Sequence, residues 1–317
     1  MQLTALSRKS AVMAMILLAV IVVTALCRRV FAPFQMEGAD SVEGVTLLNV
    51  IISGAILFGC AVINGKSHMR SGLTNGYSAL SMPIFGILSC GICVASDTLT
   101  AAITSLCLAV AVFLLLRSLR SSEEKDSIFF AAMLLGVMVL LYPPAAVFVV
   151  MLPLLVFILV LSVKQIVMLV VAYFMPFLAA SYVKWYMGYD LLSVAEGIYT
   201  SLKTYQMGAI TQLPYLAIAI ASVVLIILIW GGVHSIFRGN KMIRMARDRR
   251  AMHLFIWMTV IALTMFAIPG WDLTAFAVVA VPLSVLLAFV LGLLPETPST
   301  IAYWVLILLF AVHLFMA

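Results

Sequence analysis

Three carboxylates in one short polar segment are the side chains of this chain best suited to chemistry. Glu37, Asp40 and Glu43 recur every third residue, a spacing that would place them on one face of a helix. Carboxylates grouped in this way can act as a general base or hold a divalent cation. Arg28 and Arg29 precede them and offer guanidinium groups to a phosphate. The same composition is typical of a solvated loop whose acids balance two arginines, so both interpretations stay open.

Polar side chains inside the apolar parts of the chain give weaker signals. Cys90 and Cys93 have the spacing of a redox pair, but two cysteines in an apolar run are more often packing residues. Asn49, Asn64 and His313 also interrupt apolar runs. The sequence contains no phosphate-binding loop, zinc-protease motif or nucleophile elbow. We therefore expect no metal and no cofactor.

Long stretches without charge are the elements that must position these residues. Of the 317 residues, 65% are apolar and only 9% are charged, whereas a soluble domain has about 25% charged residues. A run of about 18 or more apolar residues can cross a bilayer. The pattern predicts an all-α, polytopic transmembrane helical bundle of about eleven spans, with nine to eleven compatible. The spans are expected near 11–30, 45–64, 77–96, 99–116, 127–142, 145–163, 166–183, 214–234, 252–268, 273–293 and 300–316.

One apolar run is too long for a single crossing. Residues 128–163 would extend about 54 Å as one helix, nearly twice the thickness of the hydrocarbon core. The run must therefore fold back on itself. Pro143 and Pro144 are the expected place, because proline interrupts a helix.

The distribution of Lys and Arg predicts the orientation. With the N-terminus in the cytoplasm, fourteen of the 18 basic residues fall on the cytoplasmic side, as the positive-inside rule requires. This spread over many loops also explains the net charge of +6 without a nucleic-acid partner. We expect a single domain, residues 1–317, that crosses the bacterial cytoplasmic (inner) membrane several times.

Two longer polar segments are expected at the membrane surfaces. Residues 184–213, on the outer side, contain an apolar series at helical spacing, which predicts an interfacial amphipathic helix: Leu191, Ala195, Ile198, Leu202 and Tyr205. Residues 235–251, on the inner side, are strongly basic and are expected to contact anionic inner-leaflet lipids. The membrane-surface residues of that segment are Arg238, Lys241, Arg244, Arg247, Arg249 and Arg250.

Part of the chain is similar to a known group of membrane proteins. The segments RSLRSSEEKDSIFFAAMLLG and LLYPPAAVF, the basic turn at Lys164, and YFMPFLAASYVKWY resemble an uncharacterised family of integral membrane proteins found in Bacteroidetes. LLNVIISGAIL and LTNGYSALSMPIF are similar to that family's second and third spans. The likeness covers about the first two thirds of the chain but departs from the family where Lys164 and Gln165 replace an Arg-Glu type of pair. It implies a polytopic inner-membrane protein, and no catalytic residues can be transferred from it.

These patterns leave three functional classes open. The leading prediction is a structural or accessory component of an envelope process, which is not an enzyme. The alternative is a polyprenyl-phosphate-dependent glycosyltransferase-like enzyme, in which Glu37, Asp40 and Glu43 are catalytic and Arg28 and Arg29 contact the phosphate. The third class is a transporter with a water-accessible cavity lined by Asn49 and Asn64. Coupled transport is disfavoured, because the predicted spans hold no ionisable group deep in the membrane.

Overall fold

A computed structural model describes most of the apolar runs. The described residues are 11–31, 47–71, 79–92, 98–120, 126–203, 220–230, 246–271, 274–294 and 296–316; Tyr205 lies outside them. Within these ranges the chain forms helices and turns and no strand, so the all-α prediction is confirmed. Four helices among the described residues are long and apolar enough to cross a membrane, which supports a membrane protein: Leu99–Leu119, Val163–Tyr186, Asp248–Ala267 and Thr274–Gly292.

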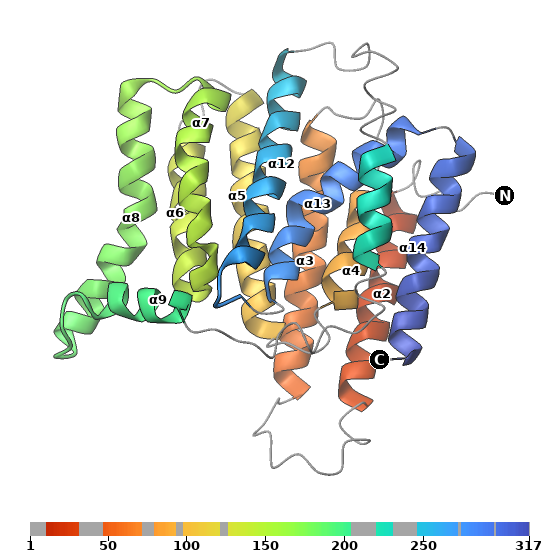
Figure 1. The fold of residues 1–317 in the computed structure, drawn as a ribbon, viewed down its shortest axis with the longest axis horizontal. Helices are drawn as coiled ribbons and strands as arrows, with labels where there is room; N and C mark the ends of the chain where they lie inside the picture. The colour runs from red at the N-terminus through yellow and green to blue at the C-terminus, as the bar shows by residue number, and fades with distance from the viewer. Residues whose placement is uncertain are drawn as a thin grey trace.

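The long helices are packed side by side, roughly parallel to one another (Figure 1). In chain order the described elements are α2 (Ala11–Phe31), α3 (Leu47–Ser71), α4 (Ser81–Ile92), α5 (Thr98–Arg120), α6 (Asp126–Leu141), the 3-10 helix η3 (Pro143–Val150), α7 (Met151–Leu159), α8 (Val163–Tyr186), α9 (Ser193–Lys203), the helix Ile220–Trp230, α12 (Ala246–Thr264), the 3-10 turn η4 (Met265–Ala267), α13 (Thr274–Leu293) and α14 (Glu296–Met316). Each predicted apolar stretch overlaps at least one of these helices.

The proline pair makes the turn that the sequence predicts. Helix α6 ends at Leu141, and Tyr142 adopts an extended conformation with φ −139° and ψ 93°. Pro143 and Pro144 then begin η3, where a missing N–H costs nothing because the first N–H groups of a helix have no partner inside it. The chain returns along α6, which contacts η3.

The next turn, between α7 and α8, is held by backbone and side-chain hydrogen bonds. Val160 ends α7 in the left-handed region, with φ 54° and ψ 60°, a conformation that is strained for a β-branched residue. The N–H of Leu161 donates to the carbonyl of Val156 at 3.2 Å. The N–H of Ser162 donates to Oε1 of Gln165 at 2.9 Å, which satisfies a free donor at the start of α8.

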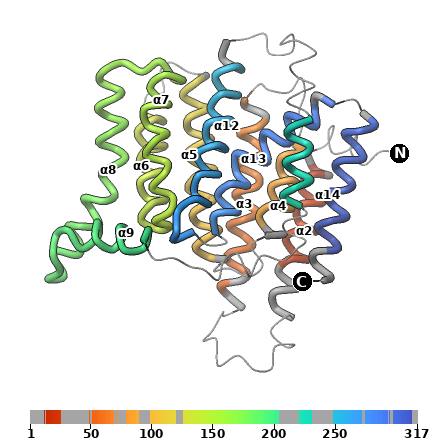
Figure 2. The backbone as a smooth tube through the Cα atoms, in the orientation of Figure 1, coloured from red at the N-terminus to blue at the C-terminus, as the bar shows by residue number. Residues whose placement is uncertain are grey.

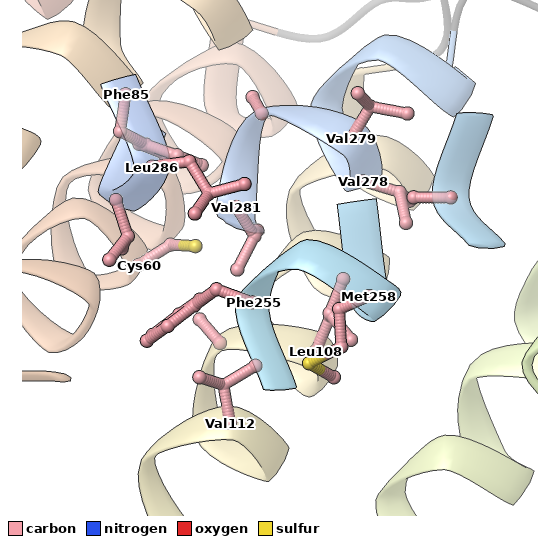
Figure 3. Packing of buried hydrophobic residues seen from close by; sticks show 14 of the residues in the cluster. Cys60, Phe85, Leu108, Val112, Phe255, Met258, Val278, Val279, Val281 and Leu286 are labelled. Carbon is pink, nitrogen blue, oxygen red and sulfur yellow. The ribbon is translucent and has the colours of Figure 1, made fainter. Parts of the chain in front are cut away.

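Helices α4 and α13 form the centre of the bundle. The side chains of α4 are buried without interruption from Ser81 to Ser89, and α4 contacts α2, α3, α13 and α14. Apolar side chains from α3, α4, α5, α12 and α13 meet in one continuous core (Figure 3). Among them are Cys60, Phe85, Leu108, Val112, Phe255 and Val281.

Helices α8 and α9 form an arm at the edge of the bundle, where α9 lies across the end of α8 (Figure 2). Helix α9 falls within the predicted interfacial segment, but its apolar side differs from the expected one. Ile198 and Leu202 are half-buried as expected, whereas Leu191 and Ala195 are exposed and Val194 is buried instead. Helix α9 contacts α8 and η3.

Two glycines of the bundle fix this arm at close range. A Cβ atom at Gly136 of α6 would overlap the backbone carbonyl oxygen of Tyr173 in α8. A Cβ atom at Gly270, after η4, would overlap the carbonyl oxygen of Ser201 in α9. Only glycine permits backbones to approach so closely. The arm is therefore attached where the bundle lacks side chains.

Candidate functional site

The carboxylates of the predicted catalytic set lie outside the described residues. This holds for Glu37, Asp40 and Glu43 alike. Arg28 and Arg29 belong to the last turns of α2, although their side chains are not among those described. The ends of α2 and α3 that flank this segment lie at the same end of the bundle as α9 (Figure 1).

The basic segment is described only at its C-terminal end. Helix α12 begins at Ala246, earlier than the predicted span at 252, so Arg247 belongs to the same helix as the apolar residues that follow. Arg249 and Arg250 are exposed, and the start of α12 lies at the end of the bundle opposite α9 (Figure 1). A role at the membrane surface stays a prediction. Outside the described residues lie Arg238, Lys241 and Arg244.

Asn64 of α3 joins two central helices. Its Nδ2 atom donates to the backbone carbonyl of Val281 at 3.0 Å and to Oγ of Ser284 at 2.6 Å, both in α13. Ser284 in turn donates to the same Val281 carbonyl at 3.1 Å. All of these side chains are buried. Because a carbonyl can only accept a hydrogen bond, the orientation of the Asn64 amide is determined by its partners.

The structure does not bring Asn49 and Asn64 together as the lining of one cavity. They are fifteen residues apart on α3, which corresponds to about 22 Å along a helix. Asn49 is half-buried, and its backbone carbonyl accepts a hydrogen bond from Ser53 Oγ at 2.6 Å. The described role of Asn64 is to join helices.

Three buried side chains of α3 and α4 have polar atoms without a hydrogen-bond partner in the described part of the chain. They are Asn64, at Oδ1, His68, at both ring nitrogens, and Ser81, at Oγ; we call them the α3–α4 polar cluster. Each of these residues is fully buried. An unpaired buried polar atom lowers the stability of a folded protein by about 1–3 kcal/mol, so the cluster as it stands destabilises the bundle.

Sequence reasoning missed His68, because Lys66 and Arg70 beside it indicate a cytoplasmic loop. Helix α3 instead continues to Ser71. Lys66 is exposed, whereas His68 is buried. His68 lies beyond the predicted span at 45–64, so the expectation that the spans hold no ionisable group deep in the membrane stays a prediction. A signal was available, since Asn64, His68 and Ser71 recur at the spacing of one helix face.

The structure does not describe the other side chains that the sequence singles out for chemistry. The side chain of Cys90 is not described, and Cys93 and the side chain of His313 also lie outside the described set. Cys60 and Cys107 are free thiols. Among the described residues, no group of His, Cys, Asp or Glu is arranged to hold a metal ion. Comparisons with protein-family models, curated proteins and solved structures find no match to this chain.

Proposed function

We propose that this chain is a multi-pass protein of the bacterial inner membrane that serves as a structural or accessory component of an envelope process. The proposal includes a cytoplasmic N-terminus and about eleven spans. It also retains the resemblance to the Bacteroidetes family of membrane proteins, which the sequence segments described above carry.

The exposure of α8 is the observation that carries this proposal. Only 17% of the apolar stretch of α8 is buried, against 83% for α13. Large apolar side chains such as Phe174, Met175 and Leu178 are exposed along it. A structural component acts through its surface, and α8 offers an apolar surface of membrane-spanning length. The partner proposed for it is a transmembrane helix of another envelope protein.

The interior supports the same proposal. Asn64 is the polar side chain that a transporter would use to line a cavity, and its Nδ2 atom donates to Val281 and Ser284 of α13. Its hydrogen bonds hold two helices together, which is a structural role.

The test compares apolar truncations on two exposed helices in cells that lack the native gene. Phe174→Ala with Leu178→Ala shortens the α8 surface, and Ile301→Ala with Leu308→Ala shortens exposed side chains of α14 as the matched control. Lipid tails are as apolar as the side chains removed, whereas a helix partner loses packing contacts. We expect the α8 pair to reduce the resistance of the cells to detergent at an unchanged protein level, and the α14 pair to have no effect.

The glycosyltransferase-like alternative predicts a different result in the same cells. A combined Glu37→Ala, Asp40→Ala and Glu43→Ala variant would then lose all function, while the α8 pair would behave as wild type. That outcome would overturn the structural proposal.

A further inference from the structure

The α3–α4 polar cluster lies beside one close approach within the contact between its two helices. A Cβ atom at Gly65 would overlap the end of the Met82 side chain. Gly65 follows Asn64 directly, and His68 lies about one turn further along α3. Ser81 precedes Met82 at the start of α4. The three polar side chains therefore lie close to the place where α3 and α4 touch.

Asn64 and His68 also share the buried face of α3. They are four residues apart, so their side chains are neighbours on the helix. Lys66 of α3 is exposed, whereas its neighbours Asn64, Gly65, Ser67 and His68 are buried. The unpaired atoms of the cluster accordingly point into the protein.

The unpaired atoms combine acceptors and donors. Oδ1 of Asn64 only accepts, a neutral imidazole carries one donor and one acceptor, and the Ser81 hydroxyl does both. An anion would oppose Oδ1 of Asn64, and an ammonium group would oppose the N–H of His68. A hydroxyl group donates one hydrogen bond and also accepts, so it can serve an acceptor and a donor of this set at the same time.

We infer that the α3–α4 polar cluster binds a hydroxyl group inside the bundle, supplied either by water or by the hydroxyl head of a lipid-soluble molecule. This inference goes beyond the proposed structural role and does not depend on it. Buried water commonly satisfies polar groups of this kind, and a hydroxyl head would accept as water does but donate one hydrogen bond instead of two.

The inference is tested by the Tm of the purified protein in lipid nanodiscs, and the sign of the change in Tm decides the result. His68→Met and Ser81→Ala each remove part of the hydroxyl site. If a hydroxyl is bound, each substitution breaks hydrogen bonds and lowers Tm by a few degrees. If the cluster is dry, each substitution removes unpaired atoms and raises Tm. A Tm that rises or does not change, relative to the controls, overturns the inference.

Two matched controls set the baseline. Ser89→Ala removes a fully buried hydroxyl from the same helix, but one that donates to the Phe85 carbonyl at 2.7 Å. His253→Met removes an exposed histidine from α12. His68→Gln retains one donor and one acceptor and should keep a Tm near that of wild type. If His68→Met fails to fold, Ser81→Ala decides the result, because alanine fits within the space of serine.

Two further measurements distinguish the sources of the hydroxyl. A bound mass that native mass spectrometry finds on wild type, and not on Ser81→Ala, identifies a lipid-soluble molecule. A lowered Tm without a bound mass identifies water, and the double variant should then lose less than the sum of the single variants. Both results support the binding of a hydroxyl.

Discussion

The centre and the edge of this bundle join their helices by opposite means. At the centre, α3 and α13 are linked by a side chain, the amide of Asn64, which donates to two groups of the facing helix. At the edge, α6 and α8 come together where Gly136 has no side chain at all. A directional hydrogen bond fixes how two buried helices are aligned, whereas a glycine lets backbones pack closely and gain many small van der Waals contacts.

The edge contains two such glycine contacts, and both attach the arm formed by α8 and α9 to the bundle. Helix α8 has its main contacts with α6, and the close approach of Gly136 to Tyr173 lies within that interface. The second approach, between Gly270 and Ser201, holds the other end of the arm. The comparison teaches that the arm is held by close backbone packing, while a polar pairing within the apolar core aligns α3 with α13. Substitutions at each place can test this difference.

Gly136→Ala should have the largest effect, because the new methyl group meets the backbone of α8, which cannot move aside as a side chain could. Overpacking of this kind costs about 1–3 kcal/mol, and we expect the upper part of that range. The measurement is the free energy of unfolding in mixed detergent micelles. Gly59→Ala on α3 is the control, since no atom lies within 4 Å of its Cβ position and alanine favours a helix. Equal effects of the two substitutions would show that the arm is not held at Gly136.

Asn64→Ala should rank second. It removes the donor that reaches Val281 and Ser284, but it also removes an unpaired oxygen, so the two effects partly offset each other. We expect a loss of about 1–2 kcal/mol in the same unfolding assay. Asn49→Ala, on the same helix, keeps the backbone carbonyl that Ser53 uses and should change little. A neutral Asn64→Ala would mean that apolar packing alone joins α3 to α13.

Val160→Gly, in the turn before α8, should stabilise the protein, whereas Gly136→Ala and Asn64→Ala should destabilise it. Glycine adopts a positive φ without the steric penalty that valine pays, and the expected gain is about 1 kcal/mol. Val167→Gly, at an exposed position inside α8, should have the opposite sign because glycine weakens a helix interior. A loss at Val160 would show that its exposed side chain makes a contact that outweighs the strain.

Gln165→Ala should give the smallest change. It removes the acceptor for the Ser162 N–H at the start of α8, and an exposed cap of this type contributes about 0.5–1 kcal/mol. Slower protease cleavage near the turn in the variant than in wild type would contradict this expectation. Lys164→Ala changes the neighbouring exposed residue and serves as the control.

The sequence was informative wherever one physical requirement decides the structure. The absence of charge predicts each apolar helix, and Pro143 with Pro144 predicts the turn after α6, because few structures can bury an uncharged run or continue a helix through two prolines. The same rule failed at His68. Flanking basic residues indicate a loop, but Lys66 can reach solvent from a helix whose other face is buried.

Pairings between distant residues were beyond reach of the sequence. Nothing in the pattern around Asn64 indicates that its partners lie in α13, since that choice depends on how all the helices pack. The same applies to Gly136, which looks like any glycine of an apolar helix until Tyr173 is placed beside it. For the predicted catalytic segment, Glu37, Asp40 and Glu43 remain a hypothesis from the sequence alone.

The 3-10 helix η3 has a consequence for the length of the apolar segment that it begins. The segment Pro143–Leu159 consists of the 8 residues of η3 followed by the 9 residues of α7. As a continuous α-helix it would extend only about 26 Å, short of the hydrocarbon core of about 30 Å. The steeper rise of a 3-10 helix, about 2.0 Å per residue, brings the same segment to about 30 Å. A stretched first half thus lets a short stretch of sequence match the thickness of a bilayer.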